Sequence, residues 1–191
     1  MKKEKPTKIR WYVLFMVSLM YLITYMDRVN ISAAAPVISK EFGFDKITMG
    51  IIFSMFTWGY AMFQVPGGWL GDKFGPRTVL GTIVTYWSIM TAVTAHCVGV
   101  ISFSIVRFLF GVGESGAFPT ATRAMQMWFT RAERGIVQGI THSASRLGAA
   151  IVPPITVAIM AAWGWRAVFY VFGAVGVLWA LVWWITYRDM P

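Results

Sequence analysis

Residues 68–77 read Gly-Trp-Leu-Gly-Asp-Lys-Phe-Gly-Pro-Arg and join two long apolar runs, 48–70 and 79–95. Gly75-Pro76 predicts a tight bend, because glycine tolerates backbone angles that other residues avoid and proline cannot continue a helix. Each run approaches the ~20 helical residues that cross a hydrocarbon core of ~30 Å. A sharp polar turn between two such runs predicts a helical hairpin across a membrane.

The rest of the chain repeats this pattern. Of its 191 residues, 57% are hydrophobic and 13% charged, whereas a soluble domain carries about 25% charged residues. A backbone in lipid must satisfy its own hydrogen bonds, which favours helices. The sequence therefore predicts an all-α membrane protein with six spans, at 12–36, 48–70, 79–95, 101–122, 135–161 and 167–187.

The Lys and Arg residues outside the spans predict the orientation, because cytoplasmic loops carry an excess of them. With the N-terminus inside, the outer loops hold three: Lys40, Lys46 and Arg166. The cytoplasmic segments hold eleven: Lys2, Lys3, Lys5, Lys8, Arg10, Lys73, Arg77, Arg123, Arg131, Arg134 and Arg188. We therefore expect a multi-pass inner-membrane protein with both termini cytoplasmic, a basic tail at 1–10 and a helical bundle at 11–191.

Five charged residues lie within the predicted spans: Asp27, Arg28, Arg107, Glu114 and Arg146. Such residues cost ~2.5–3.5 kcal/mol each even on lenient insertion scales, so they are expected to pair or to face a cavity. One explanation is a set of salt bridges that holds the helices together. Three cations against two anions leave one positive charge unmatched, and an anionic ligand would match it.

Several function classes are disfavoured. The basic residues form no stripe interleaved with exposed aromatic residues, which argues against a nucleic-acid partner. The single cysteine, Cys97, can form no internal disulfide, and no Cys/His spacing resembles a metal site. We find no nucleophile–base pair or Gly-rich phosphate loop, so we do not expect an enzyme or a cofactor.

The turn at 68–77 resembles the loop motif of the major facilitator superfamily, with Gly68, Asp72, Gly75 and Arg77 at the motif positions. Residues 107–119, Arg-Phe-Leu-Phe-Gly-Val-Gly-Glu-Ser-Gly-Ala-Phe-Pro, fit its fourth-helix pattern. Together with Trp128-Phe129 and with 25–30, Tyr-Met-Asp-Arg-Val-Asn, they are similar to the anion:cation symporter family, which carries hexonates, hexuronates and aldarates. The resemblance implies one half of a two-half fold, built as a 3+3 inverted repeat, and a cytoplasmic gate formed by the turn motif.

Roles follow from side-chain chemistry and from this resemblance. Arg28, Arg107 and Arg146 are expected to bind carboxylates, because a guanidinium fork matches them bidentately. Substrate hydroxyls are expected to meet Tyr25, Asn30, Gln64 and Ser145, although Ser145 stands where hexonate carriers of the family usually have an amide. A bound anion that competes for an Arg changes the proton balance of a nearby acid. The coupling proton is therefore expected on Asp27 or Glu114, with His142 as a third candidate.

The predicted function is proton-coupled symport of a small organic anion, such as a hexonate, hexuronate or aldarate, with H⁺ as the coupling ion. A second six-helix half is expected as partner, either a missing C-terminal domain or a second copy, so the chain alone is not expected to transport. A drug/proton antiporter half is an alternative, but its Gly-Pro-rich fifth-helix signature is absent from 139–148. A non-transporting membrane scaffold or regulatory fragment is the other alternative.

Overall fold

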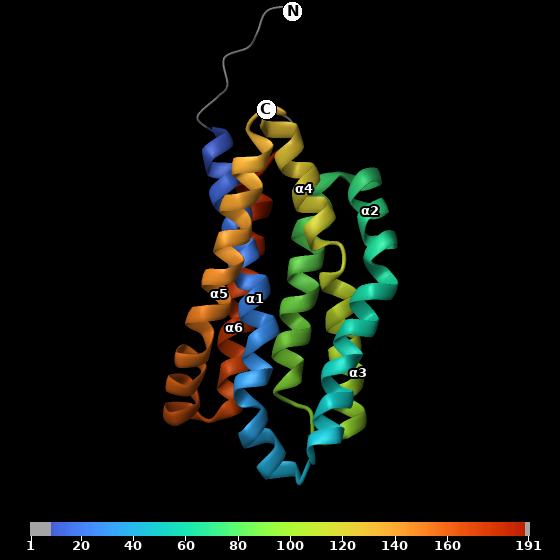
Figure 1. Ribbon diagram of the computed structural model, residues 1–191, viewed down its shortest axis with the longest axis vertical. Coiled ribbons are helices and arrows are strands. Elements are labelled where there is room, and N and C mark those ends of the chain that lie inside the picture. The colour runs from blue at the N-terminus through green and yellow to red at the C-terminus, as the bar shows by residue number, and fades with distance from the viewer. Residues whose placement is uncertain (1–8, 190–191) are drawn as a thin grey trace, which may run out of the picture.

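The computed structural model describes residues 9–189, which form α-helices and no strand (Figure 1). The predicted helical class is therefore correct. Most of the predicted basic tail at 1–10 lies outside the described residues. The helices are α1 (Ile9–Phe42), α2 (Lys46–Thr94), α3 (Val100–Glu114), α4 (Ala117–Trp128), α5 (Arg134–Trp163) and α6 (Trp165–Thr186).

The predicted turn lies inside α2. Gly75 has φ 79° and ψ 155°, a left-handed backbone that L side chains rarely adopt, and the chain reverses there. We call residues 46–74 the first leg of α2 and residues 76–94 its second leg. They correspond to the second and third predicted spans, so the predicted hairpin and its tight bend at Gly75 are confirmed.

The fourth predicted span, 101–122, differs from expectation in two ways. It is broken at Ser115–Gly116 into α3 and α4, and it continues to Trp128. The break lies at a close contact with the first leg of α2, because a Cβ on Gly67 would lie 2.7 Å from the Cα of Gly116. Further along this contact, a Cβ on Gly59 or Gly111 would overlap the opposite backbone, so glycines set the spacing of the two helices.

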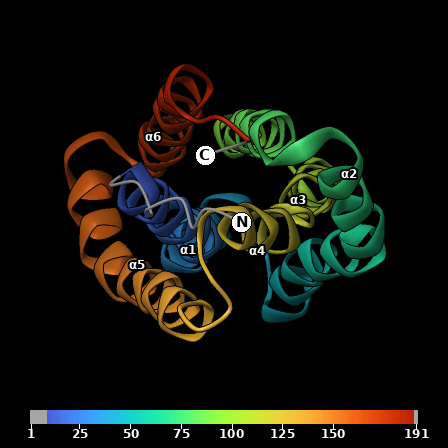
Figure 2. The ribbon, with the colours of Figure 1, turned by 90° about the horizontal axis from the view of Figure 1, so that it is seen from above.

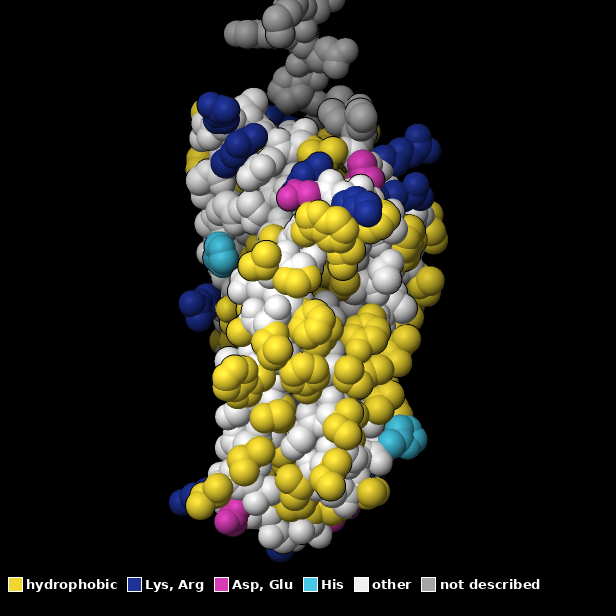
Figure 3. Space-filling view, turned by 90° about the vertical axis from the view of Figure 1, so that its right-hand side faces the viewer, with side chains coloured by type: hydrophobic (Ala, Val, Ile, Leu, Met, Phe, Trp, Pro, Cys, Tyr) yellow, Lys and Arg dark blue, Asp and Glu magenta, His cyan; other side chains and the backbone are white. Residues whose placement is uncertain are grey.

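Within residues 9–189, four segments are long and apolar enough to cross a membrane by length and composition: α1, residues 100–128, α5 and α6. The two legs of α2 are not among them, since Gly, Thr, Trp and Tyr interrupt their aliphatic residues. On the face that Figure 3 shows, hydrophobic side chains cover the middle of the bundle, and most charged ones lie towards its ends, apart from one basic side chain at the left edge near mid-height. This distribution matches a bilayer with water on both sides.

Both described ends of the chain lie at the same end of the bundle (Figure 1). Tyr12 Oη donates to Thr186 Oγ1 at 2.9 Å, which ties the start of α1 to the end of α6. Arg10 pairs with Glu133 at 2.7 Å, and hydrogen bonds from Thr130 lower the pKa of that carboxyl and keep it ionised. The topology thus has the even number of crossings that the prediction requires.

Figure 2 shows how the helices are arranged around the bundle axis. α1 and α4 lie towards the middle. α5 and the first leg of α2 lie towards one side, and α6 and the second leg of α2 lie towards the other. The first of these two sides carries the charged side chains described next, and we call it the site face.

Candidate substrate-binding site

An ion pair between Arg28 on α1 and Glu114 at the end of α3 forms the centre of the site. Arg28 Nε donates to both carboxylate oxygens of Glu114, at 3.0 and 2.9 Å. The Glu114 side chain is fully buried, whereas that of Arg28 retains 20% of its accessible surface. Arg28 Nη2 is buried and has no acceptor among residues 9–189. The guanidinium is therefore held on one edge and has donor capacity left on the other.

Four aromatic rings surround the Arg28 guanidinium and come from three helices. Its Cζ lies 4.8 Å from the ring centre of Tyr60, 5.2 Å from Phe56, and 5.3 Å from both Tyr25 and Phe118. Aromatic faces attract a cation and exclude water around it. The cage fixes the guanidinium and lowers the local dielectric, which strengthens any charge-assisted hydrogen bond that it makes.

Arg107 and Asp27 lie deeper than Arg28. The Arg107 guanidinium lies 4.8 Å from the ring centre of Phe110 and 5.2 Å from that of Phe56, and it makes no ion pair within the described range. Asp27 is buried with neither carboxylate oxygen hydrogen-bonded to a described residue, and Trp87 of the second leg lies beside it. In this conformation neither side chain reaches the surface of the bundle.

The α5 side of the site face carries Arg146 and His142, both exposed. The Arg146 guanidinium lies 6.0 Å from the Tyr25 ring, the same ring that Arg28 approaches. His142 stacks on Phe118, with ring centres 6.3 Å apart, and packs edge-on against Tyr21. Arg28, Arg146 and His142 are thus brought together around one group of aromatic rings.

Two of the expected hydroxyl-binding residues lie elsewhere. Asn30 is completely buried, and its amide has no partner among the described residues. Ser145 is also buried and donates to the carbonyl oxygen of His142 at 2.7 Å. A ligand on the site face reaches neither, because each points into the helix packing rather than outward. Tyr25 and Gln64 remain accessible.

The turn motif forms a polar pocket at the end of the bundle where both described chain ends lie. The pocket, of about 480 Å³, is lined by Gln64, Gly68, Asp72 and Arg123 among others, and Arg123 forms an ion pair with Asp72. Arg77 points the other way: its backbone N–H donates to Asp189 Oδ1 and its Nη2 to the carbonyl of Trp184, both at 2.8 Å. Within the described residues, therefore, Asp72 is tied to α4 and Arg77 to the end of α6.

Tyr60 and Phe56 belong to the site, and the sequence reasoning missed them. Tyr60 directly follows Gly59 and Phe56 lies about one helical turn before it, and both looked like ordinary aromatic residues of a membrane span. The sequence offers one indication of this role: Tyr60 lies next to the packing glycine Gly59, and the hydroxyl of a tyrosine in such a place usually hydrogen-bonds to a polar partner. Their role depends on the proximity of the first leg of α2 to α1, which local sequence does not encode.

Helical spans around a buried, partly open cationic site are typical of membrane carriers for anions. The Major Facilitator Superfamily family model matches residues 17–191, and the chain belongs to that superfamily. It is 48% identical over 188 residues to the probable sulfoacetate transporter SauU of Cupriavidus necator, covering 98% of this chain and 44% of that protein.

Other relatives extend the comparison. The chain is 35% identical to the probable galactarate/D-glucarate transporter GudP of Bacillus subtilis (94% of this chain, 41% of that one) and 35% identical to the D-galactonate transporter of Escherichia coli (96% and 43%). These relatives confirm the similarity to anion:cation symporters and exclude an enzyme. The chain spans less than half the length of each.

The fold has a solved counterpart. A bacterial homologue of the human lysosomal transporter Spinster, in an inward-facing and unoccupied conformation, superposes with a TM-score of 0.87 at 23% identity, covering 98% of this chain and 45% of that one. At this identity the likeness concerns the fold alone. It confirms the predicted six-helix half of a major facilitator fold.

Proposed function

We propose that this chain forms the N-terminal half of a proton-coupled symporter for a small organic anion, held between two six-helix halves. The observation that carries this proposal is the way the Arg28 guanidinium is held in the site. Glu114 occupies its Nε, aromatic rings enclose it, and the side chain still retains 20% of its accessible surface. A carboxylate or sulfonate that reaches this accessible part supplies acceptors in a geometry that a guanidinium fork matches.

The substrate class follows from charge and from the relatives. The names of these relatives give sulfoacetate, galactarate, D-glucarate and D-galactonate as their substrates, and all of these are small organic acids. A second cation, Arg146, lies on the same Tyr25 ring as Arg28, which favours a dianion such as sulfoacetate or an aldarate. A cationic substrate of the drug antiporter kind would be repelled by both guanidinium groups.

Coupling to protons follows from competition for Arg28. An anion that binds Arg28 weakens its pairing with Glu114, and a buried carboxylate without a partner is costly unless it takes up a proton. Asp27, buried and without a described hydrogen-bond partner, is the second proton carrier. His142 is the third candidate, because it stacks on the cage residue Phe118.

The proposed function is tested by uptake into proteoliposomes that contain the complete carrier, with an inward-directed proton gradient. We expect saturable accumulation of labelled sulfoacetate or galactarate that a protonophore abolishes. Uptake of inorganic phosphate or of a lipophilic cation in place of the organic acids would contradict the proposal. The 191-residue chain alone is expected to show no saturable uptake, because the other wall of the site belongs to a second half.

Replacing Arg146 by Gln is expected to separate dianions from monoanions. The variant removes the guanidinium that lies 6.0 Å from the centre of the Tyr25 ring, which Arg28 also approaches. Loss of one charge-assisted contact corresponds to a roughly ten-fold weaker binding of galactarate, whereas galactonate should change less than about two-fold. Competition binding with both ligands provides the measurement. Equal losses for the two acids would remove the reason to assign the second anionic group to Arg146.

The proposed orientation places residues 1–10, the 68–77 turn and both chain ends in the cytoplasm of a cell whose inner membrane holds the carrier. There Asp72 and Arg77 would close a cytoplasmic gate against the second half. Reporter fusions after Asp45 and Ala162 should read as external, and fusions after Arg77 and Glu133 as cytoplasmic. The physical basis is the excess of Lys and Arg on the inner side. A reversed reading at two of these sites would overturn the orientation.

A further inference from the structure

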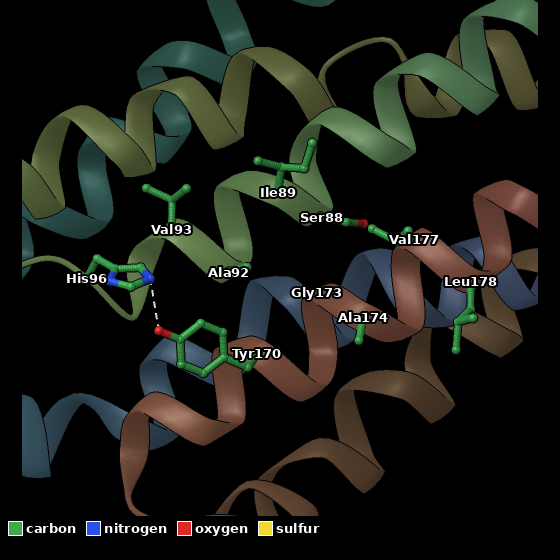
Figure 4. A pocket seen from close by; sticks show the side chains of 10 residues that line it. All are labelled: Ser88, Ile89, Ala92, Val93, His96, Tyr170, Gly173, Ala174, Val177 and Leu178. Carbon is green, nitrogen blue, oxygen red and sulfur yellow. Dashed lines mark hydrogen bonds between the residues drawn. The ribbon is translucent and has the colours of Figure 1, made fainter.

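A groove runs along the bundle on the side opposite the site face. It lies between the second leg of α2 and α6, has a volume of about 520 Å³, and we call it the α2–α6 groove (Figure 4). Its walls are mostly apolar, with Ile89 and Val93 from α2 and Ala174 and Val177 from α6. Neither the charged residues of the site nor the turn motif contribute to it.

The α2–α6 groove opens outward at the level of the hydrocarbon. Ile89 retains 47% of its accessible surface and Leu178 61%, and α6 continues outward with exposed Leu181 and Ile185. The proposed second half covers the site face, where the charged residues lie. The groove face, with no charged residue among the groove's lining residues, is left to contact lipid.

One end of the groove is polar. His96, just beyond the end of α2, and Tyr170, near the start of α6, face each other across it, with 2.9 Å between Nε2 and Oη. Whichever ring donates across this bond, the other hydrogen of the pair stays free: His96 Nδ1–H if tyrosine donates, or the Tyr170 O–H if histidine donates. The pair thus presents a hydrogen-bond donor at the helix ends, where membrane and water meet.

The dimensions agree with one lipid leaflet. Tyr170 and Leu178, which mark the two ends of the groove wall on α6, are eight residues apart, about 12 Å along a helix axis. Half of a hydrocarbon core of ~30 Å is ~15 Å. An apolar channel of this length that ends in a hydrogen-bond donor at the interface matches an acyl chain with a phosphate headgroup.

We propose that the α2–α6 groove binds one phospholipid, with an acyl chain along Ala174 and Val177 and a phosphate oxygen accepting from the His96–Tyr170 pair. The lipid belongs to the leaflet at the end where α2 ends and α6 begins. The site is independent of the proposed transport function, so either can fail without the other.

Native mass spectrometry of the protein, purified in mild detergent and titrated with phosphatidylglycerol or phosphatidylethanolamine, tests this site. Ala174→Trp fills the groove and is expected to retain one phospholipid fewer than the wild type. Leu181→Trp, on the same helix but outside the groove, is the matched control and should retain the wild-type number. Tyr170→Phe removes one hydroxyl and should weaken retention roughly five-fold, as expected for one hydrogen bond.

Equal phospholipid retention in the wild type and Ala174→Trp would overturn the proposal. So would a protein dimer in the wild-type spectrum that disappears in Ala174→Trp, because the groove would then hold a second copy of the chain. A loss of lipid in Ala174→Trp that Leu181→Trp shares would also contradict it, since the effect would not belong to the groove.

Discussion

Replacing Arg28 by Lys is expected to weaken anion binding about 10- to 100-fold, the range for losing charge-assisted hydrogen bonds at a buried site. Arg28 pairs with Glu114 through Nε, while the side chain as a whole retains 20% of its accessible surface, through which a substrate can reach it. A lysine has a single nitrogen and cannot serve both partners in this way. It also lacks the planar group that lies among the rings of Tyr60 and Phe118.

Arg166→Lys provides the matched control. Arg166 also pairs with a glutamate, Glu41 at 2.8 Å, but its side chain is 43% accessible and lies outside the site. Binding of labelled sulfoacetate or galactarate should be near normal in this variant. Near-normal affinity in Arg28→Lys as well would reassign Arg28 to a structural ion pair and remove the anion site from the site face.

Replacing Gly111 by Leu is expected to prevent the bundle from folding, at a cost of about 3 kcal/mol or more. A Cβ at this position would overlap the carbonyl oxygen of Phe56 and lie 2.9 Å from the backbone nitrogen of Tyr60. Both obstacles are backbone of the first leg of α2, so no side-chain rotation relieves the clash. Because Tyr60 and Phe56 also form the cage, any surviving protein should have lost its anion site.

Gly50→Leu tests whether the effect is specific to the contact. Gly50 lies on the first leg of α2, and a Cβ there would meet nothing within 4 Å. Its thermal unfolding midpoint in detergent should match that of the wild type. A Gly111→Leu variant with an unchanged midpoint would show that α2 and α3 do not approach as closely as the structure has them.

Much of the fold could be predicted because membrane spans are encoded locally. Apolar run length predicted the helices, and Gly75-Pro76 predicted the reversal that Gly75 makes with its positive φ. The helix ends were less predictable. α1 continues through Pro36 to Phe42, and the fourth span breaks at Ser115–Gly116. The break depends on a neighbouring helix that comes close at Gly67, which the sequence of the fourth span cannot reveal.

The charged residues of the candidate site could be predicted from the sequence, but the ion pairs between them could not. The cost of charge in lipid identified Arg28, Glu114 and Arg146 without any structure. Which acid pairs with which arginine was open, and the structure pairs Arg28 with Glu114 rather than with its neighbour Asp27. The burial of Ser145 could not be foreseen either, because neighbouring residues on a helix point in different directions: Arg146 lies on the site face, whereas Ser145 points into the helix packing.

Glu114→Gln tests proton coupling most directly. Glutamine mimics a carboxyl group that is always protonated, and it keeps a hydrogen-bond acceptor for Arg28. Two assays on proteoliposomes separate binding from coupling: exchange of labelled for unlabelled substrate without a gradient, and accumulation driven by a pH gradient. Asp27→Asn is measured in parallel, since Asp27 is the other buried acid.

We expect exchange to continue in Glu114→Gln while accumulation against the substrate gradient is lost, because the variant still changes between its two conformations with substrate bound but no longer carries a proton at position 114. Accumulation that persists in both Glu114→Gln and Asp27→Asn would contradict coupling through these acids. His142, stacked on Phe118 at the site face, would then be the next residue to replace.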